Sequence, residues 1–186
     1  MRYAGHLSPE EFWERDAAME QRVRETSTVL PCYGLVGWSG LRMIGDWEWE
    51  NDRLVTVGLA HGAPEGTGPR LHVKTTVGDP AAVVALLRAS APEARTEGSI
   101  ARWRRELEAE PDDSVTIEVD SAGVQVDVWH SEGRDRWWAA GHHGGHGLVL
   151  EAHLMSAGDV RLHRVHDLEP YLDGRRAYLR QVRGGI

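Results

Sequence analysis

Alternating apolar and polar positions predict β-strands along much of the chain. Residues 41–57 and 115–128 each alternate with period two on both sides of a turn signal. Each strand then has one apolar and one polar face, the pattern of an antiparallel hairpin with one solvated side. A third alternating run, 148–154, precedes a glycine-containing turn, so we expect it to pair with residues 160–163.

Helical periodicity predicts four helices between these strands. In each segment apolar residues recur at spacings of three and four, and serine, aspartate or proline marks most of the starts. The segments are residues 8–26, 79–91, 98–109 and 167–183. The second is apolar on nearly every side, so we expect it to be the most buried helix.

The order of these elements predicts an α+β fold, because strand meanders stand between helices instead of alternating with them. We expect a largely antiparallel sheet of about eight or nine strands in two meanders, flanked by the four helices. All of residues 1–186 should form a single compact domain. Structural halves at 1–92 and 98–186 would then suggest a duplicated helix–strands–helix unit.

The same patterns predict a hydrophobic core. Its expected members are apolar residues on inward strand positions or on helix stripes. They are Trp47, Leu86, Leu87, Ile117, Val126, Leu150 and Leu172.

Composition narrows the range of partners. The net charge of −8 argues against general affinity for nucleic acid, which needs a basic surface. No apolar run approaches the ~20 residues that span a bilayer, and no apolar signal segment follows Met1. The single cysteine, Cys32, fits a reducing compartment. We therefore expect a cytoplasmic protein that binds neither nucleic acid nor membrane.

Charge is segregated along the chain, which points to a partner surface. Between residues 106 and 135 there are ten acidic residues against one arginine. Trp138 belongs to an adjacent tryptophan pair whose side chains must face opposite ways on a strand, so we expect one to be exposed. An exposed tryptophan beside acidic residues is a typical anchor for a protein partner. The predicted binding residues are Glu118, Asp127, Trp129 and Trp138.

A glycine-rich segment, residues 141–147, gathers three histidines. Neutral imidazoles bind zinc or iron, and flexible glycines would let neighbouring rings converge. The candidate ligands are His142, His143, His146 and, on the following strand, His153. Their spacing matches no established zinc motif, so we expect no metal cofactor and keep this set as the alternative.

Three carboxylates share one face of a predicted strand. Asp46, Glu48 and Glu50 alternate with tryptophans. Such a row is able to act in acid–base chemistry or to bind magnesium, but an exposed strand face has the same pattern. We interpret it as a solvated acidic face.

Two hypotheses for function follow. The first is a non-catalytic protein-binding domain of the inhibitor or immunity-protein kind. The second is a metal-dependent enzyme, a hydrolase or an oxygenase, that uses the histidine set. We favour the first because no catalytic motif is complete: the segment around Ser39 lacks the second glycine of a nucleophile elbow, where Leu41 stands. Convergence of the four imidazole rings would favour the second.

Overall fold

The computed structural model describes residues 9–26, 29–51, 53–62, 67–90 and 107–182. These residues hold three α-helices where four had been expected. The helices are α1 (Pro9–Thr26), α2 (Pro80–Ser90) and α5 (Glu169–Val182), with a short 3₁₀ helix, η1 (Ala157–Asp159). The helix expected at 98–109 falls largely on residues 91–106, outside the described residues. Of the described helices, none has the length and apolar content needed to cross a membrane.

The strands follow the predicted order along the chain. They are β1 (Cys32–Leu35), β2 (Arg42–Glu50), β3 (Arg53–His61), β4 (Arg70–Thr76), β5 (Asp113–Val119), β6 (Ala122–His130), β7 (Arg136–His143), β8 (His146–His153) and β9 (Arg161–Val165).

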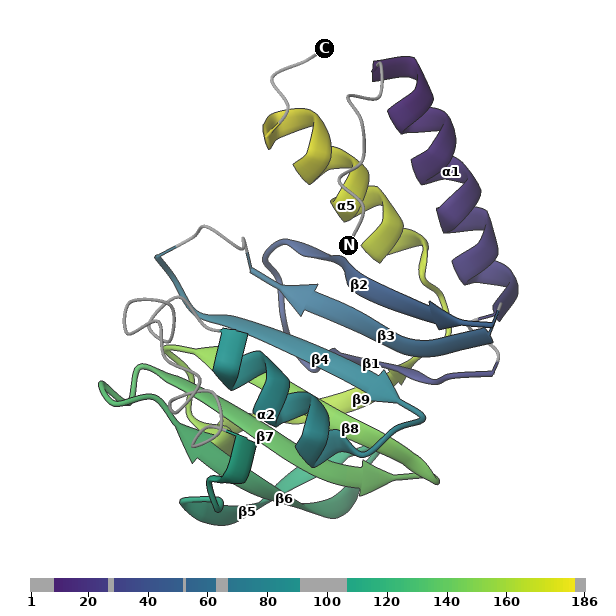
Figure 1. The fold of residues 1–186 in the computed structure, drawn as a ribbon. Helices are drawn as coiled ribbons and strands as arrows, with labels where there is room; N and C mark the ends of the chain where they lie inside the picture. Colours follow the sequence, from purple (N-terminus) through teal and green to yellow (C-terminus); the bar gives the residue numbers. More distant parts are fainter. Residues whose placement is uncertain (1–8, 27–28, 52, 63–66, 91–106, 183–186) are drawn as a thin grey trace.

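The strands form one mixed sheet that curls into a half-barrel (Figure 1). Their order across the sheet is β1-β9-β5-β6-β7-β8-β4-β3-β2. Neighbouring strands are antiparallel except β5 and β9, which run parallel, so the sheet is largely but not purely antiparallel. The predicted meanders β2–β3–β4 and β5–β6–β7–β8 are present, and β4 pairs with β8 to join them. Strands from before and after residue 98 therefore share one sheet.

The predicted hairpin between residues 148–154 and 160–163 is wrong. β8 pairs with β4 and β7, whereas β9 pairs with β1 and β5. The connection between them is not a tight turn: Leu154 adopts a positive φ of 54°, and η1 follows. This path carries the chain from one part of the curved sheet to another.

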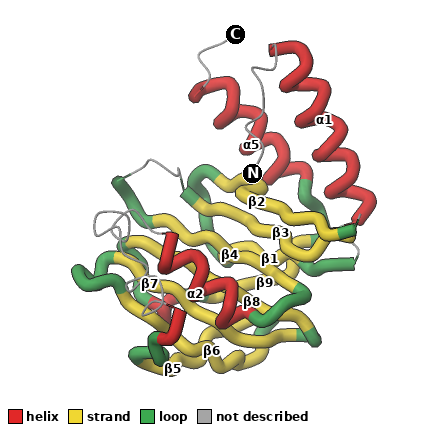
Figure 2. The backbone as a smooth tube through the Cα atoms, in the orientation of Figure 1, coloured by secondary structure: helices red, strands yellow, loops and turns green. Residues whose placement is uncertain are grey.

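Apolar side chains on the inner face of the sheet form the main core. Alternation on β4 and β8 points Leu71, Val73 and Leu150 to this face, and β1 curls back toward β3 and β4 to close it. Leu59 on β3 is opposite Val73 and so shares the face, which continues under α5 and α1 (Figure 2). The inside of the half-barrel is thus filled with side chains.

The core prediction is confirmed on β5, β6, β8 and α5 but not on β2 or α2. Ile117, Val126, Leu150 and Leu172 are buried. Trp47 and Leu87 are half-buried, and Leu86 is 50% exposed. α2 packs on the outer face of β7 and β8 through one side only. Apolar side chains on its other sides therefore stay partly exposed.

Replacing Leu86 by alanine should therefore change stability little. An exposed leucine loses less than about 1 kcal/mol of unfolding free energy on truncation. The matched control is Leu172→Ala, which removes a fully buried side chain of α5 and should cost several times more. Urea unfolding followed by circular dichroism measures both. An equal loss from the two variants would place Leu86 in the core after all.

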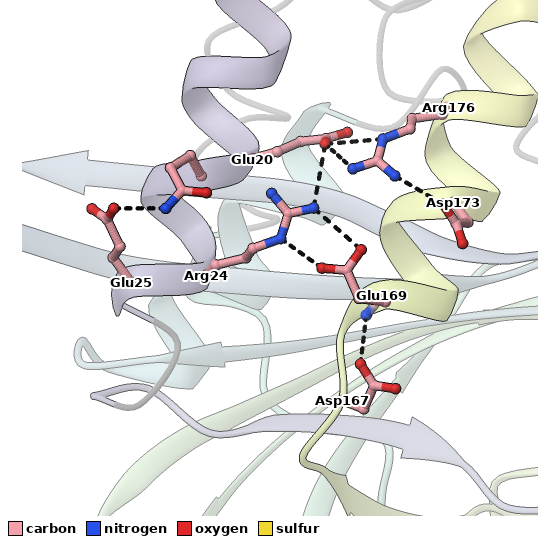
Figure 3. A network of polar contacts seen from close by, with 8 residues as sticks. Glu20, Arg24, Glu25, Asp167, Glu169, Asp173 and Arg176 are labelled. Carbon is pink, nitrogen blue, oxygen red and sulfur yellow. Dashed lines mark hydrogen bonds and ion pairs between the residues drawn. The ribbon is translucent and has the colours of Figure 1, made fainter.

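Helix α1 is held against α5 by ion pairs (Figure 3). Arg176 donates from Nε and Nη2 to Oε2 of the buried Glu20, at 3.1 and 2.6 Å. Arg24 of α1 donates from Nε to Glu169 Oε1 at 2.6 Å. A buried carboxylate is tolerated only when it is paired, so the α1–α5 contact depends on these arginines.

Candidate functional site

Two of the four predicted binding residues are exposed and two are buried. Glu118 and Asp127 lie exposed on β5 and β6. Trp129 and Trp138 are directly opposite each other on β6 and β7, and only 6% and 4% of them is exposed. The expectation of an exposed tryptophan anchor is wrong, because both indoles pack with Val84 of α2. A strand pattern defines two faces but does not tell which of them a helix covers.

The candidate metal ligands are not brought together. Gly144 and Gly145 adopt positive φ angles of 58° and 82°, so the histidine-rich segment is a tight hairpin turn, not a flexible loop. His143 pairs across the strands with His146, while neighbouring His142 faces the other side. His153 stands at the opposite end of β8. Among the described residues, no three His, Cys, Asp or Glu side chains are placed to hold a metal ion.

Several polar side chains that belong to neither predicted set as a group surround a pocket on the outer face of the sheet. This outer-face pocket has a volume of about 320 Å³ and is formed by β2, β3, β4, β7 and β8. β3 contributes one ionisable side chain, His61, at its end. The others come from β2, β4, β7 and β8. They are Asp46, Arg70, His72, Arg136, Glu151 and His153.

Strand register places His72 at the centre of this set. On β4 it is directly opposite Ala60 of β3 and Glu151 of β8. Two glycines make room for its ring: a Cβ on Gly45 or Gly58 would lie 2.5 or 2.6 Å from His72 Nε2. Contacts that short are far inside van der Waals distance, so the position of the imidazole depends on the absence of side chains on β2 and β3.

A bulge in β2 aims Asp46 at β4. The register between β2 and β3 shifts between Ile44 and Asp46. Asp46 Oδ2 then lies 2.5 Å from Nζ of Lys74, and Oδ1 lies 3.3 Å from His72 Nε2 without the alignment of a hydrogen bond. Burial lowers the pKa of His72, although nearby Asp46 opposes the shift, so the imidazole is mostly neutral at pH 7.

A second ion pair forms the β7–β8 wall of the pocket. Arg136 donates from both Nε and Nη2 to the same oxygen, Oε1 of Glu151. Its guanidinium also lies 5.1 Å from the ring centroid of Trp138, which is opposite Glu151 in the sheet. Within the described residues, no hydrogen bond reaches Glu151 Oε2. The buried tryptophan thus supports the arginine that faces the pocket.

Sequence reasoning had named only part of this pocket. His153 was one of the candidate metal ligands, and Asp46 was interpreted as part of a solvated face. His72 and Arg136 were not singled out, because they stand on different strands with no motif spacing. Glycines inside two strand patterns were the available signal, since such glycines often mark a bulge or a close approach.

Comparisons of the chain with protein-family models, curated proteins and solved structures found no match. Function therefore has to be inferred from the side chains and their geometry.

Proposed function

We propose that this chain is a non-catalytic binding protein that uses no cofactor, and that the outer-face pocket binds a small polar molecule. The observation that carries this proposal is the arrangement around His72. Strands β2 and β3 each have a glycine, without a side chain, next to the imidazole. A bulge in β2 places Asp46 beside the same ring. Ligand sites typically combine a preformed hollow with a few convergent polar groups of this kind.

Stability alone does not account for the arrangement. Lys74 and His72 are removed from water to a large extent, and buried ion pairs are often no more stable than apolar residues of similar volume. Their presence on rigid strands, facing a pocket, supports a role in recognition.

The paired state of the charges favours binding over acid–base catalysis. A general acid or base must exchange its proton with the substrate. Here Asp46 is engaged by Lys74, and Glu151 is engaged by Arg136. These carboxylates are well placed to orient a ligand through fixed hydrogen bonds.

A thermal-shift screen of small polar compounds tests the proposal. The test variant is Ala60→Leu, which fills the pocket beside His72 without removing any ionisable group. A ligand at about 100 times its Kd should raise the Tm of the wild-type chain by about 5 °C. Ala60→Leu should abolish the shift.

The matched control is Ala177→Leu on the exposed side of α5, which should keep the shift. Circular dichroism checks that both variants fold. If no compound raises the Tm of the wild type, or if Ala60→Leu responds as the wild type does, the pocket is not the binding site.

A second candidate is a protein partner on the exposed face of β5 and β6. It is supported by a more open hollow of about 520 Å³ beside Asp127, lined also by His142 and His143. An acidic surface would speed encounter with a basic partner. Co-purification from the native host should yield a partner with the wild type, and Glu118→Lys with Asp127→Lys should lose it. Recovery by both forms would exclude this face.

A further inference from the structure

We infer that the outer-face pocket takes an uncharged, hydroxyl-rich molecule such as a monosaccharide or polyol, an inference that rests on the proposed binding role. Its starting point is the balance of charge around the pocket. Asp46, Asp135 and Glu151 stand on or beside its walls, and so do Arg70, Lys74 and Arg136. Leaving histidines aside, three carboxylates match three cations among the residues that the structure describes.

This balance disfavours a charged ligand. A cation entering the pocket would approach Arg70 and Arg136, and an anion would approach Asp46 and Glu151. Either ligand would have to compete with an ion pair that is already made, and a half-buried charge without a full partner carries a large desolvation cost. An uncharged ligand leaves both ion pairs intact.

Hydrogen-bonding capacity favours hydroxyl groups. Donors and acceptors alternate around the pocket, with Arg136 beside Glu151 and Lys74 beside Asp46. A hydroxyl both donates and accepts, whereas an ammonium only donates and a carboxylate only accepts. One hydroxyl is able to bridge a guanidinium and a carboxylate, and Glu151 Oε2 has no hydrogen bond within the described residues. Several neighbouring hydroxyls would form hydrogen bonds with more of these donors and acceptors than an ion would.

The size of the pocket limits the ligand to one ring or a short chain. Its volume of about 320 Å³ lies at the low end of small-molecule sites. Met43 and Ala60 supply apolar wall, against which the carbon skeleton of such a molecule would pack.

A matched set of probes tests this inference by isothermal titration calorimetry. Glucose, ribose and myo-inositol are the uncharged probes, and glucosamine and glucuronate are charged analogues of the first. At least one uncharged probe should bind the wild-type chain, with each charged analogue of glucose at least about tenfold weaker than glucose if glucose binds. The Kd of the uncharged ligand should change less than about twofold between about 20 mM and about 500 mM NaCl, because no charge is screened.

Three outcomes would overturn the inference in different ways. Tighter binding of glucosamine or glucuronate, lost in Ala60→Leu, would keep the pocket as a binding site but reject an uncharged ligand. Heat from uncharged probes that is equal in the wild type and in Ala60→Leu would reject the pocket itself. Absence of binding by all five probes, together with a hit for a charged compound in the thermal-shift screen, would reject only the ligand class.

Discussion

Replacing Gly174 by alanine should destabilise the protein by about 3 kcal/mol, although the same change in most helices is stabilising. Alanine has the higher helix propensity, by about 1 kcal/mol. At this position in α5, however, a Cβ would lie 1.9 Å from the backbone oxygen of Arg42 in β2. Backbone cannot rotate out of the way as a side chain does, so α5 must move off the sheet or β2 must distort.

Gly68→Ala is the matched control, because a Cβ there has nothing within 4 Å. Its unfolding free energy should stay close to that of the wild type. Chemical unfolding at constant pH measures both variants. A neutral or stabilising effect of Gly174→Ala would show that α5 does not approach β2 as closely as the structure has it.

Stability should fall by about 3 kcal/mol as the pH is lowered from about 6.5 to about 4, through the titration of His61. The ring is 1% exposed and links three elements. Its Nε2 accepts a hydrogen bond from the backbone N–H of Leu35 in β1 at 3.0 Å and lies 3.4 Å from the hydroxyl of Tyr171 in α5. Since a backbone N–H only donates, Nε2 carries no proton, and Nδ1 is the nitrogen that donates to Leu71 O at 3.3 Å.

Protonation of His61 is therefore disfavoured in the folded state. Burial lowers its pKa from 6.5 to about 4, and the proton would have to enter between Nε2 and the Leu35 N–H. Between these two pH values the unfolded chain binds a proton that the folded chain does not. The contribution of His61 is thus fully present above pH 6.5 and is lost as the pH falls through about 4.

His61→Gln removes the titrating group and keeps a neutral polar side chain. Compared with the wild type, this variant should show a loss of stability that is smaller by about 3 kcal/mol over the same pH range. His166→Gln, at an exposed histidine, is the control and should retain the wild-type dependence. Urea titrations at several pH values give the comparison. Parallel curves for the wild type and His61→Gln would rule out His61 as the source.

Helix starts and strand alternation were determined by the sequence alone, since they depend on residues only a few positions apart. Asp167 is the first residue of the segment predicted as the last helix, and its Oδ1 accepts a hydrogen bond from the N–H of Glu169 at 3.0 Å. Asp79 caps α2 in the same way through the N–H of Ala81. The alternation of residues 115–128 predicted the β5–β6 hairpin, which the observed register confirms.

Tertiary structure alone decided how these elements are combined. Local alternation is satisfied by any partner strand, so it did not distinguish a β8–β9 hairpin from the observed pairing of β9 with β1 and β5. Alternation also defined two faces for the strands that carry Trp129 and Trp138. It did not show that α2 covers the face on which these tryptophans lie. The outer-face pocket depends on another long-range pairing of this kind, between β4 and β8, which sets His72 opposite Glu151. Residues 79 positions apart become neighbours through sheet topology, which no local spacing encodes.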